Sequence, residues 1–160
     1  MRLFGNIEAK IDTKGRAFLP SVFRKVLQAS GDETLFLRKD AFQTCLVLYP
    51  ESVWNQQMDM LRQKLSRWNA RHQMIYRQYV SQVEMLTLDA SGRLLLPKRL
   101  LEKVQIEQSI RFIGMGETIE IWRNGEDEEP FMEQDEFSKA LQELMGDTFD
   151  APAINYPERE

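Results

Sequence analysis

The sequence predicts an α+β protein, mostly β, in which two tandem β motifs flank a helical insertion and a helical, acidic segment follows. Three observations support this fold: a ten-residue repeat, an apolar stripe at helical spacing between its copies, and a change to acidic composition after Trp122. We expect a first β motif, a helical segment, a second β motif and an acidic appendage at residues 1–50, 51–82, 83–124 and 125–160. With 160 residues, 42% of them hydrophobic, the chain suffices for one or two small domains.

The repeat sets residues 11–20 against residues 88–97 without gaps, at an offset of 77. Asp, Gly, Arg, Leu and Pro are identical at five of the ten positions, and apolar residues match at three more. Each copy leads into a short helix-like segment, at 21–27 in the first half and at 98–104 in the second. Two apolar runs follow, at 34–37 and 45–49 in the first half and at 110–113 and 118–122 in the second. Each half therefore predicts strand, turn, strand, short helix, strand, turn, strand.

The shared pattern Asp-x-x-Gly-Arg predicts a tight turn between two strands. The carboxylates of Asp12 and Asp89 can accept hydrogen bonds from backbone N–H groups two or three residues further on, which closes an Asx-type turn. Gly15 and Gly92 permit the positive φ that such a turn often requires. The turn is therefore first of all a structural device.

The arginine that ends the pattern emerges at the start of the next strand, as Arg16 in the first copy and Arg93 in the second. Each can pair with the aspartate four residues earlier merely to fix the loop. Held in that way, it would also be a preorganised probe for a guanine edge or a phosphate. Repetition favours the second interpretation, because further basic residues surround both copies: Lys10, Lys14, Arg24, Lys25, Lys98, Arg99 and Lys103.

A helical segment is predicted between the copies, because no Gly or Pro occurs between Pro50 and Gly92. Apolar side chains and one histidine alternate there at spacings of four and three: Trp54, Met58, Leu61, Leu65, Trp68, His72, Ile75 and Tyr79. We expect two helices broken near residues 66–69 rather than one. The stripe fits ordinary core packing, and it also fits a seam with a sister repeat or subunit.

The net charge of −4 is unevenly distributed along the chain. Residues 1–116 carry 18 Lys and Arg against 11 Asp and Glu, whereas residues 117–160 carry 3 against 14. A basic body with an acidic tail is typical of nucleic-acid binders with acidic appendages, and a solvated acidic helix would give the same balance. In the tail we expect an amphipathic helix and then a frayed end, marked by Phe137, Leu141, Leu144, Gly146, Pro152 and Pro157.

Other functional classes find little support in the sequence. No run of 18 apolar residues and no signal peptide is present, so we expect a cytoplasmic protein with no membrane contact. Cys45 and His72, the one cysteine and the one histidine, cannot build a zinc site, so no metal or cofactor is expected. Without a Gly-rich phosphate loop or a nucleophile elbow, we expect no catalytic residue and no small-molecule substrate. We expect Cys45 to be a packed hydrophobe and His72 to be buried or at an interface.

These motifs resemble the MraZ family of transcriptional regulators, over roughly residues 2–124. Both copies of the turn, the helical segment between them and a closing Glu-Ile-Trp occur in the family's order. The segments that carry the resemblance are Phe4–Asn6, Asp12–Arg16, Leu19–Pro20, Phe23–Arg24, Cys45–Pro50, Asp89–Arg93 and Ile119–Trp122.

The resemblance implies an AbrB-like fold, in which swapped hairpins form a pseudo-two-fold β-barrel and the Asp-x-x-x-Arg turns face double-stranded DNA. It implies a homo-oligomer, expected as a ring, that binds repeated promoter boxes. The regulated genes would be the division and cell-wall cluster, including the protein's own operon, and the protein would be associated with the nucleoid.

Carried over by position, the resemblance implies DNA contact by Lys14, Arg16 and Arg93, and phosphate contact by Lys10 and Arg24. The aspartate of each turn orients the arginine, and the glycine forms the turn. The second turn has a serine where the first has lysine, so the two copies need not contact DNA equally.

Two other functions stay open. The chain fits a ring-forming assembly protein whose acidic tail captures a protein partner and whose basic turns serve only as subunit contacts. It also fits an antitoxin-like AbrB protein whose tail masks a toxin, although such chains are usually short and carry one copy of the motif.

Overall fold

The computed structural model describes residues 1–125 and 130–149, and the chain divides into two compact units, residues 1–125 and 126–160. The acidic run at 126–129 and the frayed end expected around Pro152 and Pro157 lie outside the described residues. In the second unit, helix α5 spans Gln134–Phe149. It therefore continues beyond Gly146, where we expected the chain to fray.

The first unit contains the predicted order of elements in both halves. The first half consists of β1 (Leu3–Lys10), β2 (Arg16–Phe18), α1 (Ser21–Ser30), β3 (Thr34–Lys39) and β4 (Leu46–Pro50). The second half consists of β5 (Glu84–Thr87), β6 (Arg93–Leu95), α4 (Lys98–Lys103), β7 (Ser109–Gly116) and β8 (Ile119–Arg123). The prediction of an α+β fold with two tandem motifs is thus confirmed.

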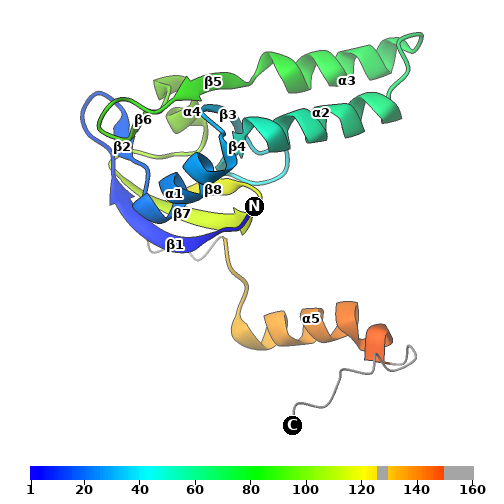
Figure 1. Cartoon of the computed structure of the whole chain (residues 1–160). Helices are drawn as coiled ribbons and strands as arrows, with labels where there is room; N and C mark the ends of the chain where they lie inside the picture. Colours follow the sequence, from blue (N-terminus) through cyan, green and yellow to red (C-terminus); the bar gives the residue numbers. More distant parts are fainter. Residues whose placement is uncertain (126–129, 150–160) are drawn as a thin grey trace. The chain divides into compact units, whose positions relative to one another are not determined.

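The two halves exchange strands. Six strands form one antiparallel sheet in the order β1-β7-β8-β4-β3-β5, and β2 pairs with β6 as a separate two-stranded ribbon (Figure 1). Strand β1 of the first half therefore lies on β7 of the second, and β5 of the second lies on β3 of the first. A closed barrel is not confirmed, because β1 and β5 are the two edges of an open sheet.

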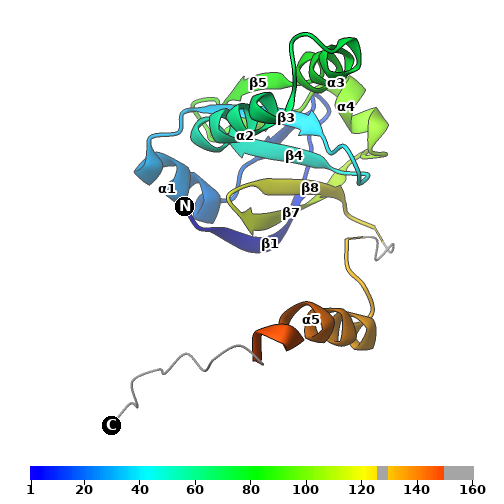
Figure 2. The same ribbon diagram turned by 90° about the vertical axis from the view of Figure 1, so that its right-hand side faces the viewer.

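The central strands are buried on both faces, which explains their continuous apolar sequences. Leu46 and Leu48 of β4 belong to the main core, which also contains the inner side chains of α1, α4 and the ribbon. Val47 and Tyr49, which alternate with them, belong to a second cluster with Trp54 and Met58. These two residues come from the helix at 51–64 (α2), which lies beside β3 and β4 in Figure 2. The alternation of Cβ directions along one strand thus supplies both clusters.

Two helices extend from the sheet as a hairpin, α2 (Glu51–Lys64) and α3 (Ala70–Ser81), so the predicted break is confirmed (Figure 1). A stack of aromatic rings fastens the hairpin to the sheet: Trp54 lies against Phe36 at 5.4 Å and against Tyr79 at 5.8 Å between ring centroids. The expectation of one continuous apolar face is wrong at Trp68, which is 98% exposed. Trp68 lies in the break, where helical spacing no longer determines direction.

Candidate nucleic-acid interface

The first turn is closed by the side chain of Asp12. Its Oδ1 accepts hydrogen bonds from the backbone N–H of Lys14 at 3.0 Å and of Arg16 at 2.8 Å, and its Oδ2 accepts one from Nε of Arg16 at 2.8 Å. The backbone N–H of Gly15 also donates to the carbonyl of Asp12, at 3.1 Å. One carboxylate therefore fixes both the loop and the arginine that follows it.

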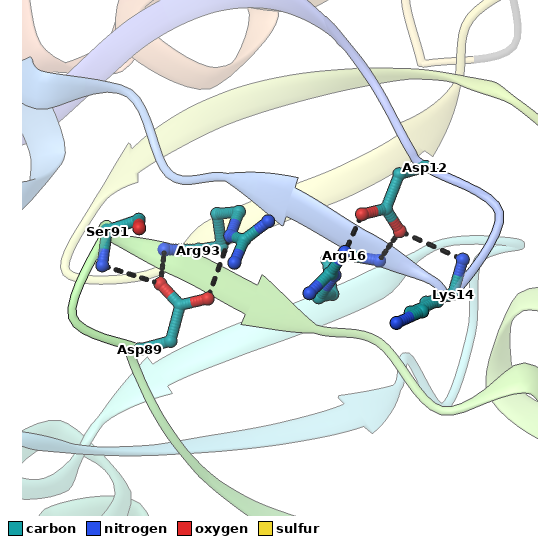
Figure 3. A network of polar contacts seen from close by, with 6 residues as sticks. All are labelled: Asp12, Lys14, Arg16, Asp89, Ser91 and Arg93. Atoms are coloured by element: carbon teal, nitrogen blue, oxygen red, sulfur yellow. Dashed lines mark hydrogen bonds and ion pairs between the residues drawn. The ribbon is translucent and has the colours of Figure 1, made fainter.

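The second turn repeats this geometry at nearly the same distances. Oδ1 of Asp89 accepts the N–H groups of Ser91 and Arg93, each at 2.9 Å, and Oδ2 accepts Nε of Arg93 at 2.8 Å (Figure 3). Ser91 contributes the same backbone N–H that Lys14 contributes in the first turn. The change from lysine to serine therefore alters the charge beside the turn and not its backbone.

The two turns are tied to each other across the ribbon. The carbonyl of Gly15 accepts the N–H of Leu96 at 2.8 Å, and the carbonyl of Gly92 accepts the N–H of Leu19 at 3.0 Å. Both glycines have positive φ, +86° and +85°, a conformation that side-chain-bearing residues rarely adopt. A Cβ at position 15 would also lie 2.9 Å from the carbonyl oxygen of Leu96. Each glycine thus supports the turn of its own half and a strand end of the other.

Arg16 and Arg93 share the outward face of the ribbon. The register pairs Arg16 with Leu95 and Phe18 with Arg93, while the intervening Ala17 and Leu94 are buried. The two arginines are therefore diagonal neighbours, with Cα atoms about 7–8 Å apart. Figure 3 shows the two turns at opposite ends of the ribbon with both arginines between them.

The aspartates occupy only one edge of each guanidinium. Nε of Arg16 and of Arg93 donates to its aspartate, and among the residues that the structure describes no hydrogen bond reaches the terminal nitrogens Nη1 and Nη2 of either. The arginine side chains are 31% and 27% exposed. These terminal nitrogens can therefore form a bidentate contact with guanine O6 and N7 or with a phosphate.

The remaining predicted contact residues differ in position. Lys10 ends β1 and Lys14 lies in the first turn, and both are exposed. Arg24, from α1 of the first half, instead packs against the second turn, where a Cβ at Gly92 would lie 2.5 Å from its Nη1. Its Nε is buried without a hydrogen-bond partner in the described part of the chain. Arg24 thus supports the turn that holds Arg93, a proximity that the linear sequence could not indicate because it arises from strand exchange.

Hydrogen bonds hold the turn aspartates in their ionised form. The backbone N–H of Arg16 is the largest cause that lowers the pKa of Asp12 below its ordinary value of 3.8, followed by the arginine side chain and the N–H of Lys14. The N–H and side chain of Arg93 and the N–H of Ser91 lower the pKa of Asp89 in the same way. The ionised carboxylates therefore stabilise the folded turns above pH 3.8, and this contribution disappears as the pH falls through the lowered pKa values.

We expect an NMR titration of the side-chain carboxyl carbons to place the midpoints of Asp12 and Asp89 below 3.8 in the intact protein. In the variant Arg16→Ala, the pKa of Asp12 should rise towards 3.8 while that of Asp89 stays unchanged, because the two networks share no hydrogen bond. The backbone N–H at position 16 remains in this variant, so a midpoint for Asp12 that is the same in both proteins would contradict the part of the shift assigned to the Arg16 side chain.

The structure places Cys45 and His72 outside the two turns. Cys45 is fully buried, as expected, and burial raises the pKa of its thiol to about 12. His72, expected to be buried or at an interface, is half-buried within the chain, and its Nδ1 accepts the N–H of Ser66 at 2.9 Å where α3 begins. No group of three metal-ligating side chains and no helix long and apolar enough to cross a membrane occurs within residues 1–125 and 130–149.

Sequence reasoning missed two features of this unit. One is Asp32, which is buried and accepts the N–H of Ser52 at 3.0 Å, fixing the start of α2. The other is the exposed pair Phe18 and Leu95 on the ribbon. The repeat could have indicated this pair, since the two residues occupy the same position of its two copies.

Comparison with known proteins places this chain in a family. A family model described as "MraZ protein, putative antitoxin-like" matches twice, at residues 3–78 and 80–147. A protein named "Transcriptional regulator MraZ" from Phocaeicola vulgatus is 60% identical over 146 residues, covering 91% of this chain and 95% of its own. Proteins of the same name are 53% identical in Bacteroides thetaiotaomicron (92% of this chain, 94% of its own) and 32% identical in Christiangramia forsetii (94% and 97%).

Proposed function

Because this chain belongs to the MraZ family of transcriptional regulators, we propose that it is a sequence-specific DNA-binding regulator whose two Asp-x-x-Gly-Arg turns form one reading surface. The contacts proposed for bases are those of Arg16 and Arg93. Lys10 and Lys14 would contact phosphates, which position the protein without reading sequence. Arg24, which we expected to contact phosphate, is proposed instead to support the second turn.

The observation that carries this proposal is the pair of matched turns on one two-stranded ribbon. The major groove of B-DNA is about 12 Å wide and admits such a ribbon. The Cα atoms of the two arginines are about 7–8 Å apart, which is roughly two base-pair steps at about 3.4 Å each. Both side chains could therefore contact bases in one groove. The excess of basic residues in residues 1–116 supports attraction to a polyanion.

Finer features of the function follow from the family resemblance. The proposed assembly is a ring of identical subunits, each an AbrB-like swapped-hairpin barrel, and the strand exchange between the halves supports that fold. The proposed sites are repeated boxes upstream of a division and cell-wall gene cluster that includes the protein's own gene. Such a protein would act in the cytoplasm, on the nucleoid.

The test is fluorescence anisotropy with two labelled duplexes, the DNA directly upstream of the protein's own gene and a scrambled duplex of the same composition. At about 0.15 M salt we expect at least tenfold tighter binding to the native duplex. The logarithm of the binding constant should fall with the logarithm of salt concentration, by about 0.9 for each phosphate neutralised. Equal affinity for the two duplexes would contradict a sequence-specific regulator.

One observation favours the alternative, an assembly or antitoxin-like protein that captures a partner with its tail. Helix α5 carries Asp135 and Glu136 in its first turn and exposes apolar side chains, among them Phe137, Leu141 and Leu144, which are 47%, 46% and 78% exposed. Equal affinity for the two duplexes would make this alternative the better one. Capture of a partner that needs α5 would then be the next test.

A further inference from the structure

Two apolar side chains are exposed in the middle of the proposed reading surface. Phe18 is 59% exposed and Leu95 is 56% exposed, and both stand on the outward face of the β2–β6 ribbon. They occupy the same position in the two copies of the repeat. An apolar side chain thus follows each arginine by two residues in both copies.

The arginines surround these apolar groups. Phe18 lies directly opposite Arg93, and Leu95 lies opposite Arg16. The guanidinium carbon of Arg93 is 5.8 Å from the centre of the Phe18 ring, within the range of a cation–π contact. The four outward side chains therefore alternate between cationic and apolar groups across the ribbon.

This alternation is poorly suited to a protein–protein contact. A second copy of the chain placed here would have to remove water from the Arg16–Asp12 and Arg93–Asp89 pairs to bury Phe18 and Leu95. A DNA groove offers anionic and acceptor groups to the arginines. Beside these it offers one apolar group, the 5-methyl of thymine, which projects into the major groove.

We propose that Phe18 and Leu95 are specificity-determining residues that contact thymine 5-methyl groups in the major groove. They do so beside Arg16 and Arg93, whose free terminal nitrogens address guanine or phosphate. This inference rests on the proposed function and adds to it a recognised chemical group. The preferred site would therefore contain thymines within about two base-pair steps of the bases that the arginines contact.

Uracil substitution tests this inference, because it removes the methyl group and leaves the Watson–Crick pairing intact. The native upstream duplex is prepared with thymidine or with deoxyuridine throughout, and its anisotropy is measured with the full chain. For the unmodified protein we expect Kd to rise about fourfold for each methyl group that Phe18 or Leu95 would otherwise cover. For Phe18→Ala and Leu95→Ala, the ratio of the two Kd values should move towards one, and in the double variant it should reach one.

Control variants and a measurement of oligomer size separate the possible causes of weaker binding in Phe18→Ala. Phe42→Ala removes the same type of side chain from a site that is 95% exposed and lies in the loop between β3 and β4. The ratio of its Kd values for the uracil and thymine duplexes should therefore equal that of the unmodified protein. If Phe18 merely positioned Arg93, Phe18→Ala would weaken both duplexes equally and keep the ratio, which would overturn the proposal. A smaller oligomer in Phe18→Ala, seen by light scattering, would overturn it in favour of a subunit contact.

The experiment also distinguishes this inference from the function on which it rests. If the unmodified protein prefers the native duplex to the scrambled one but binds the uracil form equally well, the methyl contact is wrong and the regulator remains. If it has no preference for the native duplex, both proposals fail.

Discussion

The double variant Arg16→Ala/Arg93→Ala is expected to bind the native upstream duplex at least about 30-fold more weakly than the unmodified chain. Each bidentate arginine–base contact contributes about 1–3 kcal/mol of discrimination, and the two side chains come from separate turns. Anisotropy titrations at one salt concentration measure the decrease in affinity. Light scattering should find the oligomer unchanged, because the backbone bonds that close both turns involve N–H groups rather than the arginine side chains.

A matched control removes the same charge elsewhere. Arg67 and Arg71 are exposed in the connection between α2 and α3 and at the start of α3, so Arg67→Ala/Arg71→Ala lowers the net charge equally. Its affinity should fall only slightly. If the affinity of the control falls as far as that of the turn variant, general charge attraction explains binding. If the turn variant instead falls apart into smaller species, the turns are subunit contacts.

A duplex that carries three boxes at their native spacing should bind roughly 10²–10⁴-fold more tightly than a duplex with one box. One subunit offers few contacts and is expected to bind weakly. In the proposed ring, several subunits would engage neighbouring boxes, and each later contact would form at a high effective concentration. The comparison uses the full chain, equal duplex lengths and a fixed salt concentration.

The spacing of the boxes supplies the control for this prediction. Inserting about five base pairs, half a helical turn, between boxes moves them to opposite faces of the duplex, and most of the added affinity should then disappear. Equal affinity for one and three boxes would mean that the subunits bind independently. Retention of the added affinity after the insertion would argue against a rigid ring.

The turns were predictable from the sequence because their chemistry is local. Asp12, Gly15 and Arg16 lie within five residues, and their repetition at 89–93 separates a meaningful motif from a chance one. The order of elements followed from periodicity and from Pro and Gly positions. The buried state of Cys45 followed from its place in an apolar run.

The arrangement of the strands depends on pairing between distant segments, which local patterns do not encode. Nothing near Leu3 indicates that β1 lies on β7, more than 100 residues away. The contact of Arg24 with the second turn depends on the same exchange. The prediction for Trp68 was wrong for a different reason: helical spacing was extended through the break at 65–69, where the backbone is no longer helical.

Photo-crosslinking from the two turns tests the shared reading surface most directly. Thr13 and Ala90 occupy the same exposed position of the two copies, and Cys45 is buried, so a benzophenone maleimide would label Thr13→Cys or Ala90→Cys selectively. Phe42→Cys is the control in the exposed loop between β3 and β4. Both turn positions should crosslink to the labelled native duplex, and an excess of unlabelled native duplex should suppress these crosslinks. The control position should not crosslink. Crosslinks from the control with none from either turn would contradict a DNA interface built on this ribbon.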